Sequence, residues 1–282
     1  MEVHLLRHAQ GAHNLAAYLH GAKIYKDPAF HDAELNEAGI EEATRAGEEI
    51  RSKQLAFDLV IVSPMRRTLQ TLHCLGLPSQ LPKVAIEHCR EAFGLFTCDR
   101  RSKRSELRAA FPHVDFELIA TEDDTWHDPY RRETVGEVLE RARAFFQWIC
   151  QVSHHHGYRR ILIVSHGVFL ETFTSLMEDR SFHGVFGNAE LRRITIPKSK
   201  IMEVVQPGGG GGEWAKVEPL QQAVQSGDTL QQQQETTPAK KSGGGGVGIE
   251  IEDSGGPSAL TLATSSTQRS TPASTQSPPK GI

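Results

Sequence analysis

Two short runs of the sequence, residues 59–62 and 161–164, are apolar without interruption. A strand that is exposed on one face alternates apolar and polar side chains, so an uninterrupted run indicates a strand covered on both faces. A third run, residues 3–6, ends at Arg7-His8 and is also interpreted as a strand. Strands of this kind are typical of a parallel sheet with helices on each side, because parallel strands are usually connected by helices.

Helical periodicity fills the chain between the apolar runs. One apolar stripe consists of Ile40, Ala43, Gly47 and Ile50. Asn36 is a suitable N-cap for that helix, because its side chain can accept a hydrogen bond from the first turn. A stronger stripe lies within residues 135–149, and shorter strands are predicted at 84–87 and 191–196. The alternation predicts an α/β fold, with a doubly wound and mostly parallel sheet flanked by helices.

Two segments depart from this alternation. Residues 92–134 follow the carboxyl end of a predicted strand, and an insert of that length with several aromatic and basic side chains favours a lid or pocket wall. The composition changes beyond residue 205, since fourteen of the 25 glycines lie after residue 207 among glutamine-rich and Ser/Thr/Pro-rich stretches. Such a composition cannot bury a core. We therefore expect one folded domain at residues 1–205 and a disordered, low-complexity tail at 206–282.

Charge, hydropathy and cysteine content exclude several classes of protein. The formal net charge is −4, and no part of the chain has the basic excess of a general nucleic-acid binder. No window of 18 residues is apolar throughout, which excludes a transmembrane helix. The four cysteines are scattered and no leader peptide is recognised, so we expect reduced thiols and a cytoplasmic location. Residues 247–253 have a pattern suited to adding a strand to a partner, although a tail segment without a partner is favoured.

Basic and imidazole side chains gather where the predicted strands end. Residues 3–6 lead into Arg7-His8, residues 59–62 into Arg66-Arg67, and residues 161–164 into His166-Gly167. Ligands of open α/β sheets bind outside the carboxyl ends of the strands, so these side chains should converge. A helix that begins at Gly167 would add free backbone N–H groups and the positive end of its dipole. Guanidinium groups, two imidazoles and a helix N-terminus predict an anion site suited to a phosphoryl group.

A histidine among cations can act as a nucleophile at such a site. Nearby positive charge disfavours the imidazolium form, and a neutral imidazole can attack phosphorus to form a phosphohistidine. The departing oxygen then needs a proton donor. Glu91 follows the third predicted strand and supplies a carboxyl group there, whereas its competitor Glu87 lies within that strand. This chemistry requires no metal and no other cofactor.

Four motifs follow one another along the chain. They are Arg7-His8-Ala9-Gln10 with Asn14, Leu35-Asn36-Glu37-Ala38-Gly39, Ser63-Pro64-Met65-Arg66-Arg67-Thr68-Leu69-Gln70-Thr71, and Ser165-His166-Gly167. Together they resemble the Arg-His-Gly-Glu, Leu-Thr-x-x-Gly, Ser-Pro-x-x-Arg-x-x-Gln-Thr and second-histidine motifs of the histidine phosphatase superfamily, in its phosphoglycerate-mutase-like branch. Residues 90–94 and 98–101 are similar to the Arg-Glu-Ala-Phe-Gly and Cys-Asp-x-Arg segments of plant and fungal phosphomutase-like proteins. The resemblance covers about residues 1–205.

The resemblance implies a role for each matching residue. His8 matches the phosphorylated nucleophile and Glu91 the proton donor. The implied phosphate-binding groups are Arg7, Arg67 and His166, with Asn14 as an accessory donor and Gly167 at the helix N-terminus. The Ser-Pro-x-x-Arg pattern selects Arg67 over Arg66. Ala9 replaces the usual glycine of the first motif, and the spacing between Glu91 and Gly94 is shorter than in typical mutases.

These observations predict a metal-independent phosphomonoester hydrolase that acts through phospho-His8 on a small phosphorylated metabolite. A phosphomutase is the first alternative, because it forms the same intermediate and protects it from water. The segment in which typical mutases follow the acid with Arg-His-Tyr-Gly is missing here, which favours hydrolysis. The second alternative is a non-catalytic protein that binds phosphate groups in the same pocket.

Other polar residues have competing interpretations. Arg66 and Arg90 are expected to be solvated charges rather than ligands. His13 either lines the pocket or packs in the interior. Residues 154–156, three consecutive histidines, suit a solvated turn better than a metal site. An exposed helix face and a clamp for a substrate carboxylate or second phosphate are both consistent with the basic cluster of Arg100, Arg101, Lys103 and Arg104.

Overall fold

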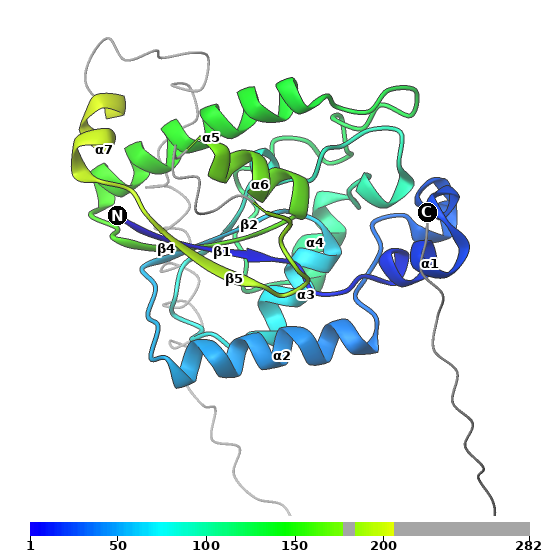
Figure 1. The fold of residues 1–282 in the computed structure, drawn as a ribbon, viewed down its shortest axis with the longest axis horizontal. Coiled ribbons are helices and arrows are strands. Elements are labelled where there is room, and N and C mark those ends of the chain that lie inside the picture. Colours follow the sequence, from blue (N-terminus) through cyan, green and yellow to red (C-terminus); the bar gives the residue numbers. More distant parts are fainter. Residues whose placement is uncertain (177–183, 206–282) are drawn as a thin grey trace, which may run out of the picture. The chain divides into compact units, whose positions relative to one another are not determined.

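A five-stranded sheet in the order β3-β2-β4-β1-β5 lies at the centre of the computed structural model, which describes residues 1–176 and 184–205 (Figure 1). The strands are β1 (Glu2–Arg7), β2 (Leu59–Val62), β3 (Lys83–Ala85), β4 (Arg160–Ser165) and β5 (Leu191–Thr195). The first four are parallel, and β5 runs antiparallel along β1. The mostly parallel sheet predicted from the apolar runs is therefore confirmed, and the carboxyl ends of four strands point the same way.

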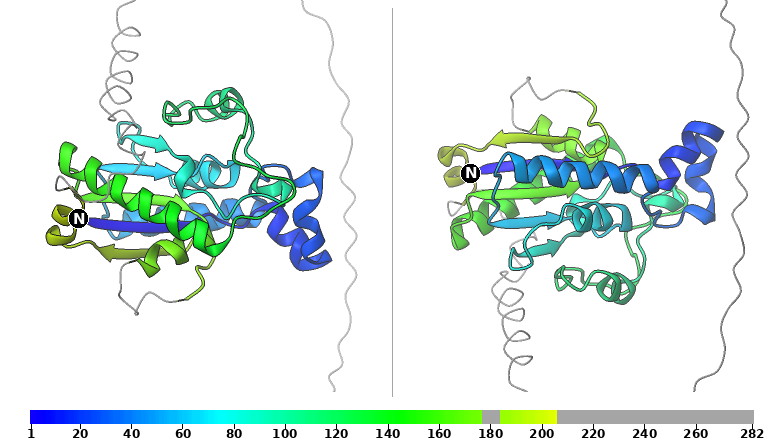
Figure 2. Two further views of the ribbon diagram at one scale, coloured as in Figure 1. Left: turned by 90° about the horizontal axis from the view of Figure 1, so that it is seen from above. Right: turned by 90° about the horizontal axis from the view of Figure 1, so that it is seen from below.

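Helices cover both faces of the sheet. Those of the described residues are α1 (Ala12–His20), α2 (Glu37–Ser52), α3 (Arg66–Cys74), α4 (Arg104–Ala110), α5 (Val135–His156), α6 (Gly167–Ser175) and α7 (Lys198–Val205), with 3₁₀ helices η1 (Ala22–Lys26), η2 (Pro28–Phe30), η3 (Glu87–Cys89) and η4 (Thr97–Asp99). Figure 2 shows α5 crossing one face and α2 crossing the other. This is the three-layer α/β arrangement that the alternation of strands and helices predicted.

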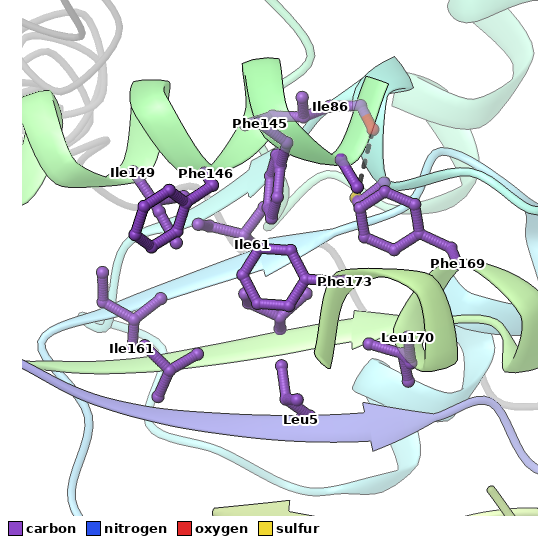
Figure 3. Close-up of a cluster of buried hydrophobic side chains, with 14 of the residues drawn as sticks. Leu5, Ile61, Ile86, Phe145, Phe146, Ile149, Ile161, Phe169, Leu170 and Phe173 are labelled. Atoms are coloured by element: carbon purple, nitrogen blue, oxygen red, sulfur yellow. Dashed lines mark hydrogen bonds between the residues drawn. The ribbon is translucent and has the colours of Figure 1, made fainter. Parts of the chain in front are cut away.

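One hydrophobic core lies between the sheet and helices α5 and α6 (Figure 3). Leu5 and Ile61 point from the strands toward Phe145 of α5 and Phe173 of α6, whose ring centroids are 5.7 Å apart. Full burial of side chains of this size contributes roughly 1.5–3 kcal/mol each. The core fixes α6 against the sheet and thereby fixes the position of the α6 N-terminus.

The alternate strand residues form a second core on the opposite face. Leu6, Val60 and Val164 pack there against α2 and α3. Gly47 of the predicted apolar stripe allows α2 to approach the end of α3, since a Cβ atom at this position would lie 2.4 Å from the Leu75 carbonyl oxygen. The uninterrupted apolar runs are thus explained, because both faces of their strands are buried.

Local predictions differ from the structure at three places. Ile40, placed on the apolar stripe of α2, is 49% exposed, because the buried face of the helix begins at Gly39 and continues through Ala43, and Ile40 lies beside it. The strand predicted at 84–87 ends at Ala85, and Glu87 begins η3 instead. Residues 154–156 form the last helical turn of α5, where imidazoles suit the negative end of the helix dipole, and Gly157 ends the helix with a φ of 72°.

The insert at residues 92–134 packs against the domain as a wall. Its Leu107, Phe116 and Ile119 join the second core, and the backbone of Asp115 hydrogen-bonds with Lys83 and Ala85 of β3. The insert also contains η4, which lies beside the carboxyl ends of the strands.

Asn36 caps α2 as predicted, accepting a hydrogen bond from the Gly39 N–H at 2.8 Å. The predicted tail at 206–282 lies outside the described residues, and no helix among those described has the length and hydropathy to cross a membrane.

Candidate active site

The structure brings the predicted residues of the strand ends together. Arg7 is the last residue of β1 and His8 follows it, Arg67 lies in the first turn of α3, and His166 follows β4 as the residue before α6. The His8 N–H donates to the Ser165 carbonyl oxygen at 2.8 Å, which ties the end of β1 to the end of β4. The ring centroids of His8 and His166 are 5.1 Å apart, and both side chains are buried. The side chains therefore form one cluster despite a separation of up to 159 positions in sequence.

The hydrogen bond of His8 defines its tautomer. Its Nδ1 lies 2.7 Å from the carbonyl oxygen of Ala9, and a carbonyl can only accept, so Nδ1 carries the proton. The Nε2 atom of a neutral imidazole then keeps its lone pair. Burial, followed by the charges of Arg67 and Arg7, lowers the pKa of His8 well below its usual value of 6.5. His8 is therefore a neutral base with Nε2 available, which is the form a nucleophile requires.

His166 has the opposite tautomer. The Arg67 Nε–H donates to its Nδ1 at 3.3 Å, so Nε2 carries the proton and donates to the Ser63 hydroxyl at 2.8 Å. Burial and the Arg67 charge lower the pKa of His166 well below 6.5. Arg67 also donates to the Cys98 carbonyl oxygen at 2.7 Å and to Asp99 at 2.9 Å. Since a guanidinium has five N–H groups, two remain available for an anion.

Arg7 and Gly167 lie against each other at the edge of this cluster. Arg7 donates from Nη1 to the Phe186 carbonyl oxygen, while its buried Nε has no hydrogen-bond partner among the described residues. A Cβ atom on Gly167 would lie 3.5 Å from the Arg7 Nε. The N-terminus of α6 and the Arg7 guanidinium thus face one region, where they can bind an anion.

Glu91 lies just beyond η3 and approaches the same helix. One carboxylate oxygen accepts from the Ala92 N–H at 2.9 Å and the other from the Val168 N–H of α6 at 3.4 Å. Burial and the neighbouring Asp99 charge raise the pKa of Glu91. Glu87, by contrast, is bound by two buried guanidinium groups, those of Arg90 and Arg101. The two glutamates are therefore in different environments, and Glu91 has the one suited to a proton donor.

The structure places Asn14 and His13 within α1. The Asn14 side-chain oxygen accepts from the Gly11 N–H at 3.0 Å and so caps the helix. His13 is buried with its ring centroid 6.2 Å from that of His8, which favours the pocket position over distant packing. Only a glycine at position 11 leaves space for it, because a Cβ atom there would lie 2.6 Å from the His13 ring.

The expectations for Arg90 and for the basic cluster were wrong. Arg90 is not solvated but 1% exposed, and it binds Glu87, Asp124 and the Asp99 carbonyl oxygen. Arg101 is likewise buried, and it donates hydrogen bonds to Glu87 and to the backbone of the insert. The basic cluster is therefore neither one exposed helix face nor one clamp for a substrate. Arg66 is half-buried and pairs with Glu34. Arg90 and Arg101 hold the insert in place, because the buried carboxylates of Glu87 and Asp124 require partners of opposite charge.

The buried imidazoles predict how stability depends on pH. Burial and nearby arginines lower the pKa of His13 to about 2, whereas in the unfolded chain a histidine titrates near 6.5. The unfolded chain therefore binds more protons below pH 6.5, and the free energy of unfolding falls as the pH decreases. At pH 5.5 each such imidazole lowers it by about 1.4 kcal/mol.

We expect the midpoint of thermal unfolding to fall between pH 7.5 and 5.5, and to fall less in a His13→Asn variant. Calorimetry at several pH values measures both, with His155→Asn on the exposed end of α5 as the matched control. An identical pH dependence in the wild type and His13→Asn would contradict this account of His13.

Comparison with known proteins agrees with the geometry. The family model described as "Histidine phosphatase superfamily (branch 1)" matches residues 3–205. A "Phosphoglycerate mutase-like protein" of Arabidopsis thaliana is 33% identical over 237 residues, covering 69% of this chain and 83% of that protein. A "Probable phosphoglycerate mutase" of Arthroderma benhamiae is 28% identical, covering 62% of this chain and 58% of that protein.

Among solved structures, a putative alpha-ribazole-5'-P phosphatase from Escherichia coli matches with a TM-score of 0.48 and 21% identity, over 70% of this chain and 91% of that one. The family match spans all of the sheet except Glu2, the first residue of β1, and includes every strand end described above. The chain belongs to the histidine phosphatase superfamily, in its phosphoglycerate-mutase-like branch, and is an enzyme with phosphatase or phosphomutase activity.

Proposed function

We propose that this enzyme hydrolyses a small phosphorylated metabolite, a phosphomonoester, through a phosphohistidine at His8 and without a metal ion. The observation that carries this proposal is the tautomer of His8, whose proton is held on Nδ1 by the Ala9 carbonyl oxygen. Its Nε2 lone pair lies among the charges of Arg7 and Arg67. A phosphoryl group bound by those two arginines would meet the lone pair directly.

In the first step, Nε2 of His8 attacks phosphorus and the bond between phosphorus and the ester oxygen breaks. Arg7, Arg67 and the N-terminus of α6 bind the phosphoryl oxygens, where negative charge lies in the transition state. His166 joins them by turning its Nε2–H from the Ser63 hydroxyl to a phosphoryl oxygen. Glu91 donates its proton to the departing alkoxide, which leaves as an alcohol. The raised pKa of Glu91 supports this role, because it keeps the carboxyl group protonated at higher pH.

In the second step, water attacks the phosphorus of phospho-His8 and the P–N bond breaks. The Glu91 carboxylate accepts the proton of the water, and inorganic phosphate forms. His8 returns to the neutral form in which Nδ1 donates to Ala9. No step requires a group outside the described residues apart from substrate and water.

A phosphomutase is the second candidate, favoured by the names of the relatives, which include phosphoglycerate mutase-like proteins. The two functions share the first step and differ in whether water or a bound hydroxyl group accepts the phosphoryl group. Product analysis on a panel of phosphorylated metabolites separates them: free phosphate supports hydrolysis, and an isomerised substrate without phosphate release supports the mutase. Binding without turnover of any phosphomonoester, an aryl phosphate included, would overturn both.

Metal independence has its own test. The cationic groups of Arg7, Arg67 and the α6 N-terminus can balance the charge of the phosphoryl group. We expect activity toward 4-nitrophenyl phosphate to be unchanged in a chelator and to be inhibited by vanadate, because vanadate mimics five-coordinate phosphorus and transition-state analogues bind tightly. Activity that a chelator removes and a divalent ion restores would contradict the proposal.

We also propose that residues 1–205 form the catalytic domain and that the tail at 206–282 is dispensable. Every residue with a proposed role lies before position 168. A chain ending at Pro207 is expected to keep kcat/KM for a small substrate within about twofold. A tenfold loss, equal to about 1.4 kcal/mol of transition-state stabilisation, would show that the tail acts at the site.

The proposed location is the cytoplasm, supported by four cysteines that are all free thiols. Three of them, Cys89, Cys98 and Cys150, are buried, and burial raises the pKa of each. The proposed partner is the small phosphorylated substrate alone. A net charge of −4 supports neither a nucleic acid nor an anionic membrane surface as a partner.

A further inference from the structure

One buried carboxylate outside the predicted set joins two arginines beside the site. Asp99, in η4 of the insert, is 4% exposed. Its Oδ1 accepts from Arg67 Nη2 at 2.9 Å, and its Oδ2 accepts from Arg132 Nη1 at 3.0 Å. The Arg132 side chain is 29% exposed and lies 4.3 Å from the centroid of the Phe96 ring. Each carboxylate oxygen of Asp99 therefore binds one guanidinium group.

The insert holds the guanidinium group of Arg67 on one side. Two of its hydrogen bonds go to consecutive residues of η4, the Cys98 carbonyl oxygen and the Asp99 carboxylate, and a third goes to His166. A guanidinium is planar and rigid, so fixing three of its five N–H groups fixes the direction of the other two. Asp99 provides the only one of these three contacts that has a negative charge.

The same charge acts on Glu91. The charged groups that face Glu91 are Asp99 of η4, Arg67 of α3 and Arg132 before α5. Asp99 raises the pKa of Glu91, and the two arginines lower it, as does the Ala92 N–H. The Val168 N–H of α6 also donates to the carboxylate, and Arg141 of α5 donates to the Glu91 carbonyl oxygen.

We propose that Asp99 is a positioning residue of this active site: it directs the free N–H groups of Arg67 at the phosphoryl group, and its negative charge assists Glu91 as proton donor. The proposal rests on the proposed function, because it takes Glu91 as the acid and Arg67 as a phosphate ligand. Asp99 does not itself touch the substrate. Replacing Asp99 should therefore change two quantities that can be measured separately: the affinity of the site for phosphate and the pH dependence of kcat/KM.

The Asp99→Asn variant tests both parts of the proposal, because asparagine has nearly the same shape as aspartate. An asparagine can still accept from Arg67, but it has no charge and its amide group cannot accept from Arg132. For an alkyl phosphate, kcat/KM should decrease at high pH as Glu91 loses its proton, and this decrease is the alkaline limb of the pH profile. We expect the limb to move to lower pH by about one unit in Asp99→Asn, because Glu91 loses a neighbouring like charge. With 4-nitrophenyl phosphate, whose leaving group needs little protonation, this limb should not move. The inhibition constant of inorganic phosphate should rise by about tenfold, because the hydrogen bond that directs Arg67 loses its charge assistance and the one from Arg132 is lost.

Two further variants distinguish this role from a structural one. Asp99→Glu keeps the charge, so its alkaline limb should remain near that of the wild type even if phosphate binds less tightly. Asp115→Asn removes a carboxylate elsewhere in the same insert and should change neither quantity. An unmoved limb together with unchanged phosphate inhibition in Asp99→Asn would overturn the proposal. A uniform loss at every pH for both substrates in Asp99→Asn and Asp99→Glu would overturn it as well, since that indicates a structural role.

Failure of the proposed function has a different signature. If Glu91→Gln leaves the alkaline limb of the wild type in place, Glu91 is not the acid, and the part of the proposal that concerns Glu91 is overturned with it. The part that concerns Arg67 is then decided by the inhibition constant of inorganic phosphate in Asp99→Asn, which does not depend on the identity of the acid.

Discussion

Replacing His8 with alanine is expected to abolish turnover of every phosphomonoester and to abolish covalent labelling of the protein. The side chain provides the nucleophile of the first step, and in its absence water would have to attack the phosphomonoester directly. Removal of a catalytic nucleophile costs on the order of 10⁴–10⁶-fold in kcat in enzymes where it has been separated from binding. Steady-state assays with an alkyl and an aryl phosphate measure the loss.

Phosphate binding distinguishes loss of chemistry from loss of folding in the His8→Ala variant. The hydrogen bonds of Arg7, Arg67 and His166 do not involve the His8 side chain, so inorganic phosphate should still bind and stabilise the variant against heat. His155→Ala, on the exposed end of α5, should leave turnover unchanged. A His8→Ala protein that still forms a stable phosphoenzyme would assign the nucleophile to another residue.

Glu91→Gln is expected to separate substrates according to their leaving groups. An alkoxide is a poor leaving group and needs a proton as the ester bond breaks, whereas nitrophenolate leaves without one. General acid catalysis typically contributes about 10²–10⁴-fold, and we expect a loss in that range for kcat/KM of an alkyl phosphate. The loss for 4-nitrophenyl phosphate should be about tenfold or less. Assays of both substrates at one pH measure the ratio.

The exposed Glu106 of α4 offers a matched control, since Glu106→Gln makes the same chemical change away from the site. It should alter neither substrate's kcat/KM. Equal losses on the two substrates in Glu91→Gln would show that Glu91 does not protonate the leaving group. The acid would then have to be sought in the insert, because both oxygens of Glu87 are bound by arginines.

The sheet and the convergence of its strand ends could be predicted from the sequence because both follow from local patterns. Uninterrupted apolar runs identify strands buried on both faces, and parallel strands bring their carboxyl ends to one edge. Arg7, His8 and His166 lie within two residues of the ends of such runs, and Arg67 follows after a short connection in the first turn of α3, so these side chains meet without any long loop. Asn36 was predictable for the same reason, since an N-cap is specified within a few residues.

The environment of the insert could not be predicted in this way. Arg90 pairs with Asp124, 34 positions away, and no periodicity links the two residues. A charged residue in a loop is usually solvated, and only the fold of residues 92–134 buries this one. The same is true of Asp99, whose partner Arg67 is 32 positions away. The Cys-Asp-x-Arg segment around Asp99 was visible in the sequence, but no local pattern shows which charge a carboxylate will meet.

The most direct measurement is a rapid-quench experiment on the wild type and on Glu91→Gln with 4-nitrophenyl phosphate, followed by peptide mapping. Loss of Glu91 removes the proposed base for the attack of water, so the phosphoenzyme should accumulate in the variant, with a burst of nitrophenol equal to the enzyme concentration. The phosphoryl group should be labile in acid, as a P–N bond is, and should lie on the peptide that contains His8. A phosphoryl group on another residue, or turnover in both proteins without any burst or trapped phosphoenzyme, would contradict catalysis through phospho-His8.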